Sequence, residues 1–392
     1  MLKLIFWILI FLVFYTYLGY GILLLFLNTI KKFLKRHPAD EKSLFEPPEV
    51  TLLVAAWNER SIVNQKMQNT RNLTYPKDRL KIVWITDGSS DGTPEVLGNY
   101  KEVKVLHQPE RQGKTAALNR ALKFIDTPFV VFSDANTILR PDSIMRLMEP
   151  FSDERVGCVA GEKRITRNYA DVAAGAGEGT YWRYEAWLKI QESKYSSALA
   201  AAGELYAIRT SLFKPVNPDS IIDDFIISMD IARQGYLIKY QPLAIAEETS
   251  SLNIKEELKR KVRIASGAVQ TVFRYPFLLN IFRHGFLSFE FISHKFLRWM
   301  IVPLAIPLIL VLNVIICLST NFTEHLYTTV LALQSIFYIF VVIGLLLEGK
   351  PVRLQFIFLP SYLAIVNYAQ YAGFIRYLRK KHNVIWEKAR RV

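Results

Sequence analysis

The sequence predicts an α/β fold with a mainly parallel sheet flanked by helices, joined to transmembrane and interfacial α-helices. Two observations lead to this fold class. Short apolar runs alternate with helix-like stretches through the middle of the chain, which is typical of a doubly wound parallel sheet. Longer apolar runs crowd the first 30 positions and the last 100 of the 392 residues. This length suits one large soluble domain plus membrane segments, at roughly 100–200 residues per domain.

The N-terminal segment is predicted to be an uncleaved membrane anchor. Leu4 to Leu27 is an almost uninterrupted apolar run, long enough to cross a hydrocarbon core of about 30 Å. It has neither the shorter apolar core nor the cleavage site of a signal peptide. We therefore predict an anchor over residues 1–30 and a basic, proline-containing linker over 31–49. The basic residues place the next domain in the cytosol of a multi-pass protein of the cell inner (plasma) membrane.

The middle of the chain carries the strand and helix signals. Three short apolar runs are predicted as buried parallel strands: Val50–Ala56, Lys81–Thr86 and Val130–Ser133. The helix-like stretches between them lie near Ser61–Asn72, Thr93–Tyr100 and Thr115–Phe124. In such sheets ligands bind outside the carboxyl ends of the strands. Two of the runs are followed by Asp87 and Asp134, so these carboxylates are where a ligand-binding group is expected.

The last third of the chain is predicted to return to the membrane. Gly285–Trp299 alternates aromatic and charged residues, which suits a helix lying in the membrane interface, and we assign residues 271–299 to an amphipathic interface segment. About three spans follow within residues 300–375. They are Met300–Leu318, Leu326–Leu347 and Leu354–Ile375, the last weakened by internal proline and polar residues. Three spans here would put the basic tail, 376–392, outside, whereas its charge favours the cytosol.

Charge and cysteine usage narrow the partners. The formal net charge is +14, and much of the excess lies in basic runs beside the spans. Such residues anchor a protein on anionic lipid at about 1 kcal/mol each, so a bilayer is expected and a nucleic acid is not. Cys158 and Cys317 fall in a predicted strand and a predicted span, so no disulfide is expected. The six histidines show no zinc-ligand spacing.

The first candidate site follows the second predicted strand. The strand leads into Asp87, and a Gly/Ser loop then turns into a helix at Thr93. Such a loop offers backbone N–H groups and a carboxylate at the mouth of a nucleotide pocket. An ordinary Asp-Gly turn with a helix cap explains the pattern equally well.

The second candidate site is Lys114, which follows Gly113 at a predicted helix start. A lysine in this position can contact a phosphate. The spacing is not that of a P-loop, and a solvated lysine is the alternative.

The third candidate site is Asp134, at the end of a strand, with Asn136 two residues on. A carboxylate and a second oxygen can hold a hard divalent cation such as Mg²⁺ together with substrate phosphates. Helix capping is the alternative.

The fourth candidate site is the pair Asp223 and Asp224, which lies in an apolar stretch before a predicted helix. Paired acids are costly to bury without a purpose, and one of them could act as a general base. A pair of N-cap residues is the alternative.

In this order and spacing, the four clusters resemble the family 2 glycosyltransferases, which have a GT-A fold with a mixed sheet. The resemblance covers roughly residues 50–270 as a cytosolic glycosyltransferase domain. The flanking spans resemble the membrane-bound branch, which includes bacterial synthases of hyaluronan, cellulose and poly-N-acetylglucosamine. The resemblance implies that Asp87 recognises the nucleotide base, that Asp134 contacts the diphosphate and metal beside Asn136, and that Asp224 is the catalytic base.

Further segments extend the resemblance. Lys114 lies in a stretch similar to the donor-contacting segment of the family, while Gly203 and Glu204 resemble its segment near the acceptor, to which Asp223 is also assigned. The QxxRW-like motif of membrane synthases corresponds to 260–264 here. Arg260 and Arg263 keep the basic positions, where they would contact the donor diphosphate, but Ile264 replaces the tryptophan expected at the acceptor. Donor binding is therefore better supported than processive polymerisation.

One aromatic stretch stays open between packing and function. Residues 179–187 carry tyrosine and tryptophan at helical spacing. Packing is the favoured interpretation, and an amphipathic helix facing the membrane interface is the functional one.

The resemblance implies an inverting hexosyl- or N-acetylhexosaminyltransferase that uses Mg²⁺ or Mn²⁺ and a nucleotide-sugar donor, with a uridine nucleotide as the family's commonest choice. The acceptor is either a growing polysaccharide or a membrane lipid that receives a single sugar. A non-catalytic membrane protein, in which the acids only cap helices, is the third alternative. Association with partner membrane proteins is an open possibility.

Overall fold

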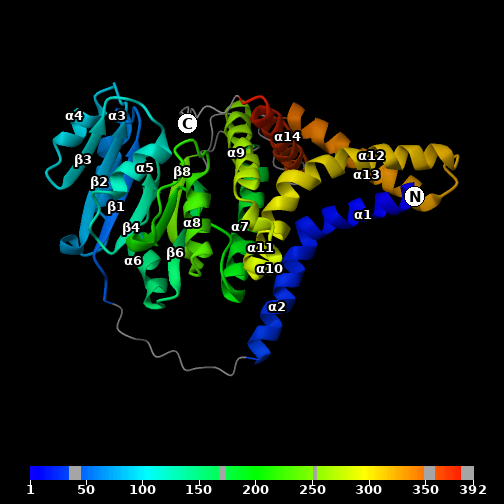
Figure 1. Cartoon of the computed structure of the whole chain (residues 1–392). Coiled ribbons are helices and arrows are strands. Elements are labelled where there is room, and N and C mark those ends of the chain that lie inside the picture. Colours follow the sequence, from blue (N-terminus) through cyan, green and yellow to red (C-terminus); the bar gives the residue numbers. More distant parts are fainter. Residues whose placement is uncertain (35–45, 167–173, 250–253, 348–357, 381–392) are drawn as a thin grey trace.

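The computed structural model describes residues 1–34, 46–166, 174–249, 254–347 and 358–380. An α/β domain lies at one end of the described chain, and a helical arm projects from it (Figure 1). The N-terminus lies at the far end of this arm, beside the connection between α12 (Val302–Ser319) and α13 (His325–Leu346). Two hydrogen bonds from Lys3 Nζ to the Glu324 carboxylate, of 2.5 and 2.7 Å, hold these segments together.

The domain is built on an eight-stranded sheet. In spatial order the strands are β3 (Val103–Gln108), β2 (Leu80–Asp87), β1 (Val50–Ala56), β4 (Phe129–Asp134), β7 (Leu205–Arg209), β6 (Val156–Thr166), β8 (Leu237–Thr249) and β5 (Ile138–Leu139). The first four strands are parallel to one another, whereas β7 runs antiparallel to both β4 and β6. β6 and β8 are again parallel, and β5 is antiparallel to β8. The predicted mainly parallel, mixed sheet is confirmed.

Helices cover both faces of the sheet. They are α3 (Arg60–Arg71), α4 (Thr93–Gly98) and α6 (Ser143–Met148) on one face, and α5 (Lys114–Leu122) and α8 (Asp223–Arg233) on the other. Successive side chains of a strand point to opposite faces, so in β1 Leu53 enters one core while Leu52 and Val54 enter the other. Burial on both faces explains why these strands appear in the sequence as continuous apolar runs.

The predicted elements around the site agree closely with the structure. The first predicted strand coincides with β1, and the other two are each one residue longer at both ends, as β2 and β4. The three predicted helices correspond to α3, α4 and α5 with ends shifted by at most two residues. Both cysteines are buried and unpaired, as expected.

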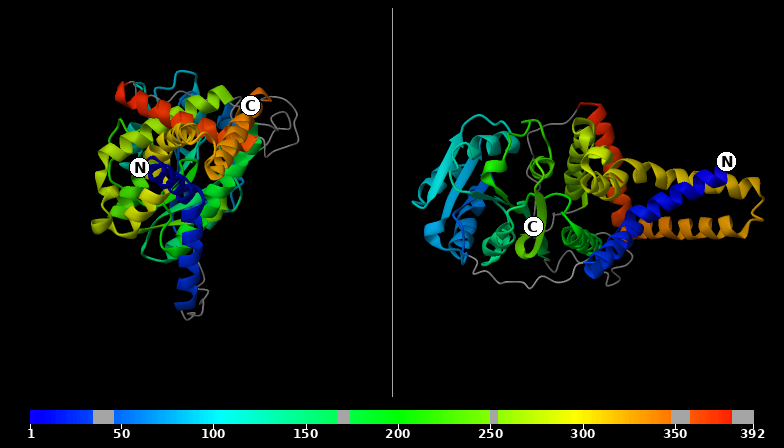
Figure 2. Two further views of the ribbon diagram at one scale, coloured as in Figure 1. Left: turned by 90° about the vertical axis from the view of Figure 1, so that its right-hand side faces the viewer. Right: turned by 60° about the horizontal axis from the view of Figure 1, so that its bottom comes forward.

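Three helical segments of the described chain are long and apolar enough to cross a membrane: Leu2–Leu34, Phe286–Ser319 and His325–Leu346. The first consists of α1 (Leu2–Phe14), a π-helical turn at Tyr15–Gly19 and α2 (Tyr20–Leu34). The second consists of α11 (Phe286–Glu290), a π-helical segment at Phe291–Ile301 and α12. The right view of Figure 2 shows α1, α12 and α13 running away from the sheet as one arm, and the left view looks along this arm from its tip.

The remaining helices lie between the sheet and the arm. They are α7 (Ala174–Tyr195), α9 (Ile254–Arg274), α10 (Ile281–His284) and α14 (Phe358–Leu378), with a short 3₁₀ turn at Pro276–Leu279 between α9 and α10. Further 3₁₀ turns, at Lys77–Arg79, Glu149–Ser152 and Thr210–Leu212, connect elements of the α/β domain. α14 corresponds to the third predicted C-terminal span but is not one of the three segments above. It lies against α9 (Figure 1).

Three predicted boundaries differ from the structure or extend beyond it. Helix α2 continues to Leu34, past the predicted end of the anchor, and 35–45 of the linker lie outside the described residues. The same holds for 354–357 of the last predicted span and for 381–392 of the basic tail. In the predicted interface segment, His294 and Arg298 are buried against α7 rather than exposed, because they pair with its carboxylates.

Candidate active site

A large cavity opens at the carboxyl ends of β1 and β4 and extends to α7, α9 and α14. Its volume is about 1280 Å³, somewhat above the roughly 300–1,000 Å³ of common ligand pockets. Nine of the ten site residues predicted from the sequence line it: Lys114, Asp134, Asn136, Gly203, Glu204, Asp223, Asp224, Arg260 and Arg263. Their positions span 150 residues of sequence, so the fold brings them together. The tenth, Asp87, lies outside the lining.

Lys114 and Asp134 face each other across the ends of α5 and β4. Lys114 Nζ donates a hydrogen bond of 2.7 Å to Asp134 Oδ1. Burial lowers the pKa of Lys114, but the charges of Asp134 and Asp223 outweigh burial and raise it above its ordinary value. The ammonium is therefore charged, and it is placed where a strand end and a helix start meet, as phosphate-binding groups often are.

A buried lysine supports the Asp134 turn from below. Lys66 of α3 is 1% exposed, and its Nζ donates hydrogen bonds of 2.8 Å to Ser133 Oγ and 2.7 Å to the Thr137 carbonyl. Burial lowers the pKa of Lys66 to about 7. Because both partners flank residues 134–136, Lys66 fixes the turn that presents Asp134 and Asn136 to the cavity.

Asp223 and Asp224 begin α8 and face the cavity. Burial, followed by the charge of Asp223, raises the pKa of Asp224 to about 7, against the opposing effect of Lys114. Asp223 Oδ2 is buried and makes no hydrogen bond within the described residues. Two close carboxylates, of which one titrates near neutrality, are the arrangement expected of a general base.

Gly203 leaves space around Asp224. A Cβ atom at position 203 would lie 3.3 Å from Asp224 Oδ2 and 3.6 Å from Lys114 Nζ. The absence of a side chain here therefore keeps access open to the carboxylate and the ammonium together.

The loop that carries the acidic pair is held from two sides. On one side, Thr115 of α5 donates a hydrogen bond of 2.9 Å to the Ser220 carbonyl. On the other, Gln270 of α9 is 2% exposed and uses both ends of its amide on the loop. Its Oε1 accepts from Ile221 N at 3.2 Å, and its Nε2 donates to the Asp219 carbonyl at 3.0 Å. The position of the Asp224 carboxylate thus depends on α5 and α9 together.

Glu204 belongs to a buried ionic chain. Lys163 of β6 pairs with Glu204 at 2.5 Å and with Glu248 of β8 at 2.6 Å. Burial raises the pKa of Glu204, but Lys163 outweighs it and lowers the pKa to about 2. Glu248 Oε1 in turn accepts a hydrogen bond of 3.0 Å from Asn136 Nδ2. The predicted acceptor residue and the predicted metal ligand are therefore joined through two residues that the sequence analysis did not select.

Asp87 lies apart from the other nine predicted site residues. Its side chain is fully buried, and its carboxylate accepts hydrogen bonds from Gln112 N at 3.1 Å and Gly113 N at 2.7 Å. Gly113 has φ of +98°, a conformation that glycine adopts without strain. Asp87 thus holds the turn that precedes Lys114, and its oxygens point into the protein rather than into the cavity.

The two arginines of α9 differ in their surroundings. Arg260 makes a bidentate ion pair with Glu257, one turn earlier on the same helix, with bonds of 2.9 and 2.8 Å. Arg263 is half-buried at the cavity wall, and burial lowers its pKa against the attraction of Asp223. Arg263 therefore interacts with the charges of the acidic pair, whereas Arg260 is paired with Glu257.

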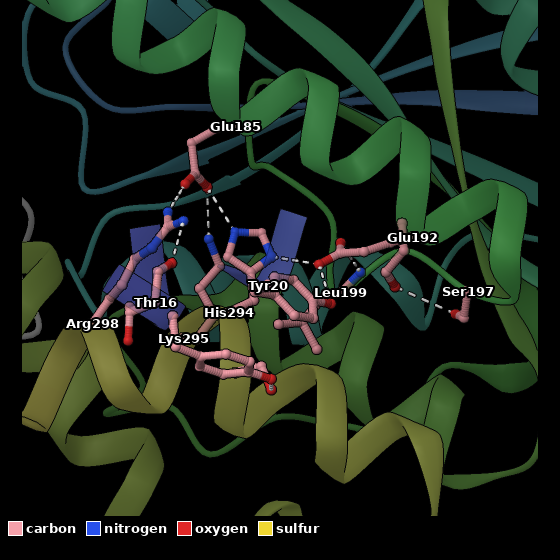
Figure 3. Close-up of polar contacts among 12 residues, drawn as sticks. Thr16, Tyr20, Glu185, Glu192, Ser197, Leu199, His294, Lys295 and Arg298 are labelled. Atoms are coloured by element: carbon pink, nitrogen blue, oxygen red, sulfur yellow. Dashed lines mark hydrogen bonds and ion pairs between the residues drawn. The ribbon is translucent and has the colours of Figure 1, made fainter. Parts of the chain in front are cut away.

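A buried ionic cluster (Figure 3) contributes Glu185 and Lys295 to the cavity lining. Glu185 of α7 binds Lys295 at 2.9 Å, His294 at 3.1 Å and Arg298. His294 also reaches Glu192, at 2.6 Å, with its other ring nitrogen. Burial raises the pKa of Glu185, but Lys295 and Arg298 outweigh it and hold the pKa well below its ordinary value. The cluster also contacts the first of the three long apolar segments, through the Thr16 carbonyl and the Tyr20 hydroxyl.

The donor atoms around Asp134 fit a divalent cation only in part. Asp134 offers a carboxylate and Asn136 an amide oxygen, which are the hard ligands that Mg²⁺ and Mn²⁺ accept. Among the described residues, no three histidine, cysteine or carboxylate side chains are grouped to hold a metal ion. Mg²⁺ is commonly bound by one or two carboxylates plus substrate phosphates. The residues thus fit a cation that binds together with a diphosphate.

Comparison with known proteins agrees with this geometry. A family model described as "Glycosyltransferase like family 2" matches residues 47–267, which covers more than half of the chain. This chain belongs to that family. It is therefore a glycosyltransferase, and the resemblance seen in the sequence motifs is confirmed. The matched region contains all of the predicted site residues.

Individual relatives of this glycosyltransferase share less than a third of its residues over the matched region. It is 28% identical over 232 residues to a poly-beta-1,6-N-acetyl-D-glucosamine synthase from Staphylococcus aureus, covering 57% of this chain and 56% of that protein. The corresponding synthase from Staphylococcus epidermidis is 27% identical over 232 residues. The chain thus spans about half the length of the curated relatives it matches.

A solved structure supports the fold over the whole chain. A mannosyltransferase from Pyrobaculum calidifontis, determined in complex with GDP-Man and Mn²⁺, superposes with a TM-score of 0.68 at 22% identity. The match covers 97% of this chain and 100% of that one. The GT-A-type fold and the helices outside the sheet are therefore shared with a known glycosyltransferase.

Proposed function

We propose that this glycosyltransferase inverts the anomeric centre while it moves a sugar from a nucleotide-diphosphate donor to a growing polysaccharide or a membrane lipid. The observation that carries the proposal is Asp224. Its carboxylate lines the cavity beside Lys114 and Asp134, and its pKa is raised to about 7 by burial and by Asp223. A base of this pKa is partly ionised and able to accept a proton at neutral pH.

In the proposed reaction an acceptor hydroxyl oxygen attacks the anomeric carbon. The new C–O bond forms on one face of the sugar as the bond to the nucleoside diphosphate breaks on the other. Asp224 takes the hydroxyl proton, a contribution typically of about 10²–10⁴-fold. Lys114 and Arg263 place positive charge at the leaving diphosphate, and Arg260 adds to it at a greater distance.

A divalent cation is proposed to complete the donor site. Asp134, with Asn136 beside it, would hold Mg²⁺ or Mn²⁺, which would neutralise charge on the diphosphate oxygens. The mannosyltransferase neighbour was determined with Mn²⁺, which supports this choice.

The nucleotide base is proposed to bind beside the turn that Asp87 holds. Trp57 lines the cavity here, and the guanidinium of Arg111 lies 3.3 Å from the centre of its ring. We propose that Asp87 acts through the Gln112–Gly113 turn rather than by direct contact. A uridine nucleotide stays the proposed donor, as the commonest in the family.

The membrane arrangement is proposed to be three spans with the catalytic domain in the cytosol of a plasma-membrane protein. One span before the domain and two after it bring the chain back to the cytosolic side. α14 would then lie at the cytosolic surface beside α9, and the basic C-terminal residues would follow on the side that the positive-inside rule favours. This arrangement removes the conflict that a fourth span creates.

The test of the proposed base is Asp224→Asn in purified membranes. We expect donor binding to persist while transfer falls by at least about 10²-fold. Asp230→Asn is the matched control, because Asp230 lies on the same helix outside the cavity. Near-normal turnover of Asp224→Asn would refute the assignment.

The acceptor class is tested separately. The two proposed acceptors give different products, so purified wild-type protein is offered a panel of radiolabelled nucleotide sugars and the product is sized. A long polymer supports polysaccharide synthesis. A single sugar on extractable lipid supports the alternative, which the apolar side chains of Val366 and Ala369 in the cavity wall favour.

A further inference from the structure

A continuous stretch of the cavity wall leads from the ionic cluster to the proposed base. We call it the acceptor wall and define it as Glu185, Lys295, Trp299 and Phe225. All four line the cavity, as does Asp224, which precedes Phe225 in the chain. They come from three elements: α7, the π-helical segment and α8.

Trp299 connects the two ends of this wall. Its ring lies 5.5 Å from that of Phe225, with the planes tilted by 59°. It is also 6.0 Å from the ring of Phe291 in an edge-on arrangement. Aromatic contacts of this kind stabilise a defined ring orientation. The indole is therefore held rigidly beside the residue that follows the base, with part of its surface in the cavity.

Glu185 and Lys295 form the charged end of the wall. Lys295 Nζ donates a hydrogen bond of 2.9 Å to Glu185 Oε2. Arg298 and His294 bind the same carboxylate (Figure 3) but do not line the cavity. Because these partners fix Glu185, the pair presents an oriented acceptor and an oriented donor group to the cavity.

Lys295 is four residues before Trp299, so the two side chains lie on neighbouring positions of one helical face. The wall therefore offers a flat apolar surface with a paired carboxylate and ammonium beside it. A pyranose ring matches this arrangement, because its C–H groups form an apolar face and its hydroxyls both donate and accept hydrogen bonds. A free phosphate matches it less well, since Glu185 already neutralises Lys295.

We propose that the acceptor wall binds the terminal pyranose ring of a glycan acceptor, with Trp299 against its apolar face and the Glu185–Lys295 pair at its hydroxyls. This inference rests on the proposed transfer and selects the glycan among its two acceptor classes. Bound in this way, the ring would lie beside Phe225, which follows Asp224 in the chain, and a hydroxyl on its far edge would face the cavity that holds the base. Trp299 would then determine acceptor binding without contact with the donor.

The test compares Trp299→Leu, Trp299→Phe and Phe296→Leu with wild type in the full chain. Phe296 is the matched control, because it lies on the same helical segment and packs on the core but does not line the cavity. The donor is the nucleotide sugar that wild type uses, and the acceptor probe is a short β-1,6-linked N-acetylglucosamine oligosaccharide. Two rates are measured: transfer to the oligosaccharide, and hydrolysis of the donor to free sugar without acceptor.

Trp299→Leu is expected to raise the KM for the oligosaccharide about tenfold, equivalent to about 1.4 kcal/mol of lost binding. Donor KM and donor hydrolysis should stay within about twofold, which also shows that the variant is folded. Trp299→Phe keeps an aromatic face and should raise the acceptor KM by less, and it decides the matter if Trp299→Leu hydrolyses no donor. Phe296→Leu should match wild type in both rates.

Two results overturn the inference and leave the transfer standing. One is an unchanged acceptor KM in both Trp299 variants. The other is a wild-type enzyme that glycosylates a lipid but never the oligosaccharide. A wild type that neither transfers nor hydrolyses any nucleotide sugar overturns the proposed function itself, so the two failures are distinguishable.

Discussion

Replacing Asp224 with asparagine should make the protein more stable while it removes transfer. The pKa of Asp224 is raised to about 7 by burial and by Asp223, whereas an aspartate in an unfolded chain has a pKa of about 3.9. Between these values the folded state keeps a proton that the unfolded state has released. The stability of wild type therefore falls as pH rises from about 4 to about 7, and it stays low above that range. Asparagine carries no such cost.

The size of the effect follows from the shift. About three pKa units, at 1.36 kcal/mol each, set an upper limit of about 4 kcal/mol. Water in the cavity screens the charge, so we expect a gain of about 1–2 kcal/mol at pH 8. For a domain of this size that corresponds to a rise in Tm of about 2–8 °C. At pH 4.5, only slightly above the pKa of the unfolded chain, wild type has lost little stability through this group, and the gain should fall to about a quarter.

The assay is thermal unfolding of purified protein in detergent, without nucleotide, at pH 4.5 and pH 8. Asp219→Asn serves as the control of opposite sign, since Asp219 makes a bidentate ion pair with Arg274, at 2.6 and 2.7 Å, and its loss should lower Tm slightly. If Asp224→Asn is less stable than wild type at pH 8, Asp224 is a helix-capping residue, and the reasoning from its raised pKa fails.

Three further predictions concern the groups around the base. Asp223→Asn removes the charge that helps to raise the pKa of Asp224, so the acidic limb of the pH–rate profile should move to lower pH, which a profile of kcat at saturating donor measures. Gln270→Leu removes both hydrogen bonds to the loop that carries Asp224. It should lower kcat about tenfold and leave the donor KM unchanged, as expected when a positioned group is displaced. Gln270→Glu keeps one acceptor, so its kcat should lie between those of Gln270→Leu and wild type. Glu185→Gln leaves the buried cations of the cluster without their carboxylate and should lower stability by about 3 kcal/mol, seen as a lower Tm. An unchanged pH–rate profile in Asp223→Asn would contradict the first prediction. A changed donor KM in Gln270→Leu would contradict the second, and an unchanged Tm in Glu185→Gln the third.

The strands and the carboxylates at their ends could be predicted because their signals in the sequence are local. The run at 50–56 is buried on both faces, so its apolar residues follow one another without a break, and its boundaries are visible in the sequence. The carboxylates at the strand ends could be found for the same reason, since the topology of a parallel sheet fixes where strand ends lie. In the structure, Asp134 and the acidic pair line one cavity.

The side-chain orientation of Asp87 could not be predicted in the same way. A carboxylate after a strand and before a Gly/Ser loop can either contact a ligand or accept hydrogen bonds from backbone N–H groups of the protein. The turn at Gln112–Gly113 decides between them, because its N–H groups would be buried without a partner if Asp87 turned to the cavity. That turn lies 25 residues further along the sequence.

The acceptor wall was missed because its partners are distant in the sequence. The alternation of aromatic and charged residues near Trp299 indicates a helix at the membrane interface when it is considered alone. Lys295 instead pairs with Glu185, 110 residues earlier, so the charges face the protein. A buried charge needs a partner. The several charges of this aromatic stretch therefore indicate that carboxylates elsewhere in the sequence pair with it.

The helix that holds the base loop also contacts the last described helix, and both contacts are made at glycines. At Gly373 of α14 a Cβ atom would lie 2.5 Å from Ala265 Cβ, and at Gly267 of α9 one would lie 2.8 Å from Ile221 Cβ. Close-packed contacts of this kind cannot absorb a shift by local adjustment, because no free volume separates the backbones. A displacement of α14 must therefore move α9, and with it the loop that ends in Asp224. The geometry of the proposed base is thus set by helices outside the sheet as well as by the sheet itself.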